Sequence, residues 1–163
     1  MSQDPGSSRG APLGTGRRLA LLSCALAWLL PGAGHFFLGR RTRGMAFLGI
    51  VVTTYLIGLG LDGRAYLADR EHPLTALATF ANVGIGPLDV LQRRATYDRL
   101  VWQLPADPAR EPLLAAMRTR VRSQNSDYGT AFLLTAGLMN LLLILDAYDV
   151  AVGRKATLEE QPE

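Results

Sequence analysis

The chain has 163 residues, a net charge of +3 that comes almost entirely from arginine, and one cysteine. A single cysteine excludes an internal disulfide and any metal cluster built from several thiolates, and the length corresponds to one domain. Charged residues are confined to the connections and the two ends, whereas the helices of a soluble bundle would carry charge along one face throughout. The composition therefore indicates a membrane protein. The excess of basic over acidic residues favours anionic lipid over nucleic acid as the partner.

Four stretches contain no Asp, Glu, Lys or Arg, and they are 19–39, 44–61, 73–88 and 130–145. A bilayer core about 30 Å thick requires about 20 mainly apolar residues per helix. The sequence predicts an all-α bundle in the cell (inner) membrane, with about four transmembrane helices in a single domain at 19–155. The predicted helices are 19–38, 44–61, 73–91 and 128–152.

The first predicted helix follows a segment, 1–18, that is rich in Gly, Ser and Pro and is predicted to be a disordered tail. Pro31 and the glycines after it should weaken this helix near its end. A cleaved signal peptide, or a lipoprotein box at Cys24, is the alternative interpretation. We expect a retained helix, because another long apolar stretch follows almost at once and Cys24 stands only a few residues after Arg18.

A short basic turn, with Arg40, Arg41 and Arg43, separates the first two predicted helices. So few residues allow only a tight turn, which makes the two helices antiparallel neighbours. We expect the three arginines to contact lipid headgroups, as basic residues at a membrane surface commonly do.

The third predicted helix is interrupted at 84–87 by two glycines and a proline, so a re-entrant or surface helix is the alternative there. The polar connection 92–127 follows, and its apolar spacing after Pro112 predicts an amphipathic cytoplasmic surface helix. Residues 156–163 are predicted to be a disordered tail. Further headgroup contacts are expected from the arginines of this region, which are Arg93, Arg94, Arg118, Arg120 and Arg122.

With four spans, ten basic residues fall on the side of the first and third connections and seven on the other. Basic loops stay cytoplasmic. This difference favours an orientation in which both termini lie outside and the two arginine-rich connections lie inside.

The segment 31–44, PGAGHFFLGRRTRG, resembles the TM-two domain family, in which two membrane helices flank such a turn. The resemblance covers 19–61. The remainder, in particular 128–132 and 136–151, looks like a small bacterial membrane family of unknown function. Neither resemblance implies an activity or assigns a role to a named residue.

Several polar residues within or beside the apolar stretches are candidates for function. An ionisable group such as His35 is a functional hypothesis by default, although a structural hydrogen bond at the membrane boundary is the alternative. The three-residue spacing of Asp146 and Asp149 places both carboxylates on one helix face, for cation binding, proton relay or pairing with nearby arginines. Asp89 can pair with an arginine one turn later, and two amides, Asn82 and Asn140, suit interhelical hydrogen bonds.

No nucleophile, phosphate-binding loop or metal-ligand cluster stands in a recognisable setting, so the sequence predicts no catalytic residue, metal or cofactor. The favoured function is a noncatalytic accessory, scaffold or assembly subunit, with a membrane-protein partner or a homo-oligomer. The alternative is a small homo-oligomeric channel or transporter lined by Asn82 and Asp89. A lipid-modifying enzyme would need His35 and an aspartate at one interface, and the four-span topology puts Asp146 on the opposite side.

Overall fold

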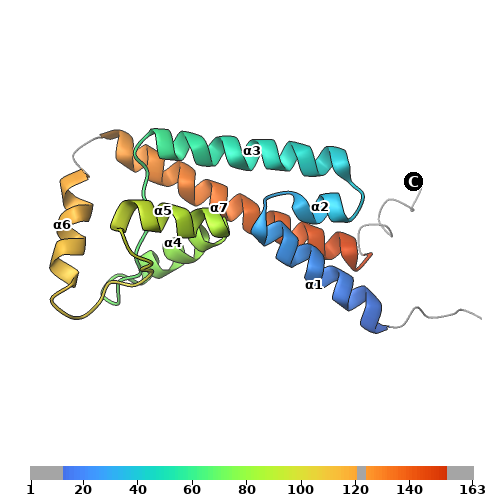
Figure 1. The fold of residues 1–163 in the computed structure, drawn as a ribbon, viewed down its shortest axis with the longest axis horizontal. Coiled ribbons are helices and arrows are strands. Elements are labelled where there is room, and N and C mark those ends of the chain that lie inside the picture. The colour runs from blue at the N-terminus through green and yellow to red at the C-terminus, as the bar shows by residue number, and fades with distance from the viewer. Residues whose placement is uncertain (1–12, 121–123, 154–163) are drawn as a thin grey trace, which may run out of the picture.

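The computed structural model describes residues 13–120 and 124–153, and this part of the chain is helical with no extended strand (Figure 1). The predicted all-α class is therefore confirmed. The helices are α1 (Leu13–Leu29), α2 (Ala33–Phe37), α3 (Arg41–Gly60), α4 (Pro73–Val83), α5 (Pro87–Tyr97), α6 (Arg110–Arg120) and α7 (Gln124–Ala151).

Two long helices, α3 and α7, run antiparallel along the molecule (Figure 1). Helices α1 and α4 pack against α7, and α2 packs against α3. Gly58 near the end of α3 faces Gly129 near the start of α7, where an added Cβ would lie 2.9 Å from the Gly129 carbonyl oxygen. Two segments, Arg41–Gly60 and Asn125–Ala151, are long and apolar enough to cross a membrane. They correspond to the second and fourth predicted spans.

The first predicted span is wrong, because the helix breaks and the chain folds back. Helix α1 ends at Leu29, and Gly32 then adopts a left-handed conformation with φ 82° before α2. Pro31, which cannot donate a backbone hydrogen bond, stands in this break. Helix α1 lies antiparallel to α7 and stops about halfway along it, so α1 and α2 form a hairpin that opens at the end where α7 finishes (Figure 1).

Helix α1 also begins earlier than expected, at Leu13, so residues 13–18 are helical and do not belong to a disordered tail. Residues 1–12 and 156–163, the rest of the two predicted tails, lie outside the described residues.

The third predicted span is likewise bent, by 119° between α4 and α5. The bend lies at Gly84–Gly86, where Gly86 has φ 72° and Pro87 opens α5 as its first residue. This is the interruption that the sequence predicts. Helices α4 and α5 form a second hairpin that opens at the other end of the molecule, beside the start of α7 (Figure 1). By length and composition, the described residues therefore contain two helices able to cross a membrane, or three spans if the bent pair α4–α5 counts as one, and four spans are not shown. The structure has two long helices and two hairpins.

The connections after α3 and α5 close this second end. Leu67, Tyr97 and Leu113 form a small apolar cluster there, separate from the main core around Val51, Ile85 and Leu133. Only Arg110–Arg120 of the predicted 92–127 connection forms a helix of its own, because its first residues belong to α5.

Because α1 does not span, its start, the turn before α3 and the end of α7 share one end of the molecule (Figure 1). The orientation predicted from ten basic residues against seven assumed that the amino-terminal arginines and the turn lie on opposite sides. That assumption is wrong, since a hairpin returns the chain to the side on which it started.

Candidate functional site at the helix junction

The two hairpins meet halfway along the molecule, on α7, at a single buried asparagine. Asn140 Nδ2 donates hydrogen bonds to the Ala27 carbonyl oxygen at 3.3 Å and to the Gly84 carbonyl oxygen at 2.8 Å. Trp28 Nε1 donates to the Val83 carbonyl oxygen at 3.1 Å. The ends of α1 and α4 are therefore joined both to each other and to α7. We call the site formed by these five residues the junction.

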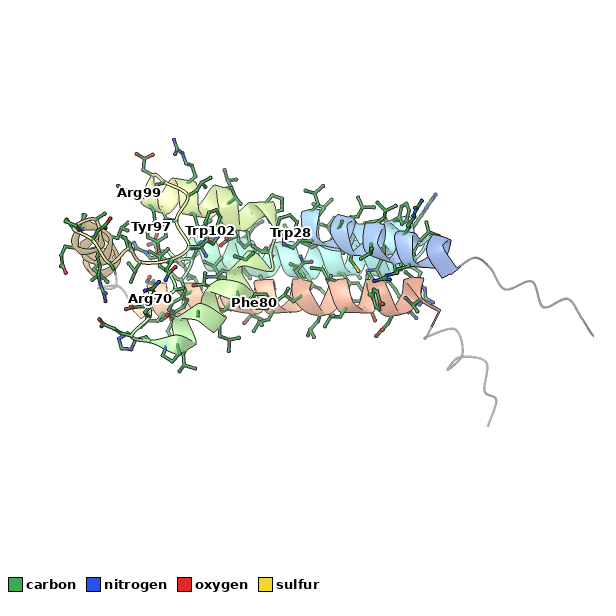
Figure 2. All side chains as sticks on the ribbon, turned by 90° about the horizontal axis from the view of Figure 1, so that it is seen from below. Trp28, Arg70, Phe80, Tyr97, Arg99 and Trp102 are labelled. Carbon is green, nitrogen blue, oxygen red and sulfur yellow. The ribbon has the colours of Figure 1, made fainter. Side chains whose placement is uncertain are left out.

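Glycines make this close approach possible. A Cβ added to Gly137 of α7 would lie 2.0 Å from the Ala81 carbonyl oxygen, and one added to Gly86 would lie 2.0 Å from the Trp28 carbonyl oxygen. Real Cβ atoms essentially never approach backbone so closely. Figure 2 shows Trp28 and Phe80 near the middle of the long axis, far from both ends. At 1.5 Å per residue, Asn140 stands about 24 Å from the first residue of α7 and about 16 Å from the last.

Three buried polar atoms beside this contact have no hydrogen-bond partner among the described residues: Asn140 Oδ1, Asn82 Oδ1 and Asn82 Nδ2. Asn140 is fully buried and Asn82, in the last turn of α4, is 3% exposed. Asn140 makes the interhelical hydrogen bonds that the sequence predicts, whereas Asn82 makes none within the described part of the chain. A buried amide without partners is costly unless something else satisfies it.

A second buried contact brings together two candidates that the sequence places on opposite sides. His35 Nε2 lies 2.7 Å from Asp146 Oδ2, and the histidine ring packs edge-on against Phe47 with centroids 5.0 Å apart. His35 is fully buried, while the Asp146 side chain is 21% exposed. The predicted separation of these residues is wrong because α1 folds back. Asp149, three residues further along α7, is half-buried.

His35 Nδ1 is buried and, among the described residues, bonds to no hydroxyl, thiol or other polar group. In a hydrolase triad the ring nitrogen opposite the carboxylate contacts the nucleophile. Two candidate nucleophiles on α1 bond elsewhere, since Ser23 donates to the Ala20 carbonyl oxygen and Cys24 to the Ile144 carbonyl oxygen. This contact therefore has the geometry of an anchor between α2 and α7.

Asp89 pairs with Arg93 one turn later, as the sequence predicts. Arg93 Nε lies 2.7 Å from Asp89 Oδ2, which also accepts a hydrogen bond from Trp102 Nε1 at 3.1 Å. Arg93 Nη1 donates to the Tyr66 and Val101 carbonyl oxygens, and its guanidinium lies over the Trp102 ring. The expectation that Arg93 contacts lipid headgroups is wrong, because this side chain is fully buried and ties α5 to the two connections.

Of the other arginines predicted to meet headgroups, Arg41, Arg43 and Arg94 are exposed and Arg40 is half-exposed. The turn from Gly39 to Arg43 surrounds an open hollow of about 370 Å³. The side chains of Arg118 and Arg120, and the whole of Arg122, lie outside the described residues.

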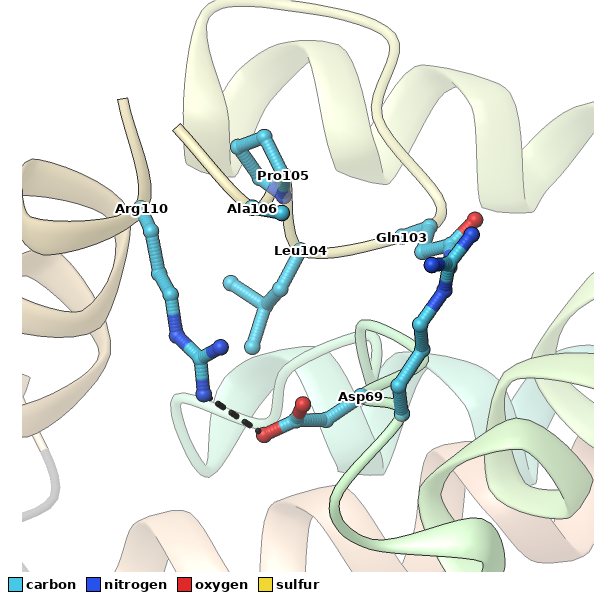
Figure 3. Close-up of a pocket in the computed structure, with 7 residues that line it drawn as sticks. Asp69, Gln103, Leu104, Pro105, Ala106 and Arg110 are labelled. Carbon is cyan, nitrogen blue, oxygen red and sulfur yellow. Dashed lines mark hydrogen bonds and ion pairs between the residues drawn. The ribbon is translucent and has the colours of Figure 1, made fainter. Parts of the chain in front are cut away.

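No sequence pattern predicts the pocket of about 230 Å³ that lies at the opposite end of the molecule (Figure 3). Arg110 forms ion pairs with Asp69 at 3.3 Å and with Glu71 at 3.5 Å. The carboxylates and His72 place three possible metal-ligand atoms within 4.8 Å of one another, and Arg110 already neutralises this cluster. The pocket is lined by residues that are far apart in the chain, so no local motif predicts it.

Comparison with known proteins identifies a family but no function. No curated protein and no solved structure shows a significant match to the chain. The resemblance to the TM-two module therefore remains a prediction, while the expected match to an uncharacterised family is confirmed. The model of DUF6677, a family of unknown function, matches residues 22–156, which include most of the first hairpin, the whole second hairpin and both long helices, and the chain belongs to this family.

Proposed function

We propose that this protein is a noncatalytic integral membrane protein that acts as an accessory, scaffold or assembly subunit in the inner membrane. One observation carries the proposal: large apolar side chains face outward while polar ones are buried. Leu74 is 78% exposed, Leu91 67% and Leu142 64%, whereas His35 and Arg93 are fully buried. Such an inverted distribution suits a lipid surround, where apolar exposure has no cost and polar groups must be satisfied internally.

The buried polar groups support a structural role because they are used to hold helices together. The His35–Asp146 contact fixes the first hairpin to α7, and the Asp89–Arg93 pair fixes the second to its connections. None of these four residues lines the hollow at Gly39–Arg43 or the pocket around Asp69 and Arg110. Lipid phosphates are the ligands we expect for Arg40, Arg41 and Arg43 in the turn.

The test is purification in mild detergent followed by native mass spectrometry. A defined larger membrane protein that co-purifies in fixed stoichiometry supports the subunit proposal, and its identity gives the function. A homo-oligomer carrying only lipid contradicts it. Extraction by alkaline carbonate, which removes peripheral proteins, would contradict membrane insertion itself.

A second candidate is a small homo-oligomeric channel or transporter. The observation that favours it is the meeting of two oppositely directed hairpins halfway along the molecule, since transporters place discontinuous helices at their midplane sites. Ion flux in liposomes tests it. Flux in the wild type that is abolished by Asn82→Leu supports this candidate, and the absence of flux contradicts it.

A further inference from the structure

The pocket at Asp69 is built by two chain segments that backbone hydrogen bonds hold together. The Ala68 amide donates to the Trp102 carbonyl oxygen at 2.8 Å, and the Leu104 amide donates to the Ala68 carbonyl oxygen at 2.9 Å. Beside this pairing, Asp69 on one segment and residues 103–106 on the other line the cavity of about 230 Å³ (Figure 3). Main-chain bonds therefore fix the two walls independently of the side-chain ion pairs.

Side chains of both signs meet at this pocket and balance each other. The Asp69 side chain is 10% exposed and lies 3.3 Å from Arg110, whose side chain is 28% exposed. Arg70 also lines the pocket, and Glu71 lies 3.5 Å from Arg110. Two acids thus face two arginines, which leaves little net charge to attract a simple anion or cation. A carboxylate beside a guanidinium matches a ligand that carries one positive and one negative group.

The ion pair at the pocket can accept such a ligand without being broken. Arg110 contacts both acids through Nη2, and a guanidinium has about five N–H donors in all. Asp69 accepts the Glu71 amide at Oδ1 and Arg110 at Oδ2, and a carboxylate offers about four acceptor sites. Figure 3 shows the Asp69 and Arg110 side chains meeting at the cavity that both of them line.

Large apolar side chains stand beside the pocket on both segments. Trp102 and Leu100 are 37% and 52% exposed, and Leu74 at the start of α4 is 78% exposed. Tryptophan is enriched where a membrane meets water. Asn140 stands about 24 Å from the first residue of α7, whereas half of a hydrocarbon core is about 15 Å. A span centred near Asn140 therefore carries this end of the molecule to the depth of lipid headgroups.

We propose that the pocket binds the headgroup of phosphatidylethanolamine, with the phosphate on Arg110 and the primary ammonium on Asp69 and Glu71. This headgroup joins its two opposite charges by a short ethylene link, and charged hydrogen bonds are the stronger ones. Phosphatidylglycerol lacks the ammonium, and the quaternary nitrogen of phosphatidylcholine has no N–H to donate. The inference rests on the membrane insertion in the proposed function, while partner purification tests the subunit role separately.

The test is native mass spectrometry of the full chain after exchange, in mild detergent, with equal amounts of phosphatidylethanolamine and phosphatidylcholine of the same acyl chains. We expect about tenfold stronger retention of phosphatidylethanolamine, because its ammonium hydrogen-bonds to a carboxylate. Asp69→Asn keeps an oxygen for the Glu71 amide and should abolish this preference. The control is Asp107→Asn, at an exposed acid of the same connection that does not line the pocket, and it should keep the full preference.

A second variant keeps the test decisive where Asp69→Asn does not fold. Ala106 is exposed and lines the pocket, so Ala106→Phe should fill the cavity and weaken phosphatidylethanolamine binding about tenfold without removing a charged group. Equal retention of the two lipids by the wild type would overturn the proposal, and so would a full preference in either variant.

A soluble ligand with the same headgroup is distinguished by glycerophosphoethanolamine, which lacks acyl chains. Binding of this compound as tightly as the lipid would overturn the assignment to a membrane lipid, whereas weaker binding supports it. Release of the wild type by alkaline carbonate would contradict membrane insertion and the proposed function with it. A chain that stays in the membrane but shows no lipid preference would contradict this site alone.

Discussion

At the scale of single residues, the buried polar contacts decide how the hairpins are held. We expect His35→Ala to lower stability by about 2 kcal/mol, because it removes a hydrogen bond to a charged group from a fully buried site. The measurement is thermal or denaturant unfolding in detergent. Asp146→Asn and the double variant complete the cycle. Additive losses in that cycle would show that the 2.7 Å contact contributes no coupling.

The Asp89–Arg93 pair makes a sharper residue-scale prediction. Asp89→Ala leaves the fully buried Arg93 guanidinium without its carboxylate and should cost about 3 kcal/mol or more. Asp89→Asn retains an oxygen that can accept the bond, so its loss should be smaller. Glu111→Ala, at an exposed position in the first turn of α6, is the matched acidic control. Equal losses at the three variants would argue against a buried pair.

At the scale of elements, two glycines differ in whether helix packing requires them. Gly137 of α7 lies in a close helix contact, whereas Gly49 of α3 does not. Gly137→Ala would place a Cβ 2.0 Å from the Ala81 carbonyl oxygen, forcing α4 away from α7. Gly49→Ala on α3 meets no atom within 4 Å and should be neutral or slightly stabilising, by up to about 1 kcal/mol. Comparable stabilities of the two variants, measured by unfolding in detergent, would contradict the packing of the second hairpin.

The hairpin formed by α1 and α2 predicts which residues share a membrane face. With Cys24→Ala as background, Arg18→Cys and Thr42→Cys should react with an impermeant thiol reagent from the same side, and Ala106→Cys from the other. The two former positions flank a hairpin that returns to its starting end (Figure 1). Labelling of Arg18→Cys and Thr42→Cys from opposite sides would restore the four-span topology predicted from hydropathy alone.

At the scale of the whole molecule, the two ends differ in how their charges are arranged. Around Asp69 and Arg110 acids and bases neutralise each other (Figure 3), whereas the start of α3 presents Arg40, Arg41 and Arg43. We expect replacement of these three by Gln to reduce anionic lipid retained in native mass spectra, because arginine binds phosphate through charged hydrogen bonds. Arg70→Gln, on an exposed side chain at the neutralised end, should leave lipid retention unchanged.

The sequence by itself determined the helical class, α3, α7 and the positions of both breaks, because apolar runs and Gly–Pro interruptions are local signals. It also determined the Asp89–Arg93 pair, which lies within one helical turn. A break frees backbone groups from the helix, and whether the chain reverses there depends on the hydrogen-bond partners that these groups find. Only the tertiary structure decided that the chain reverses at both breaks. At the junction those groups meet Asn140, more than 50 residues from either hairpin end in the chain. The same reversal brings His35 to Asp146, a contact that no local pattern encodes, since hydropathy measures whether a segment enters the membrane and not whether it leaves on the other side.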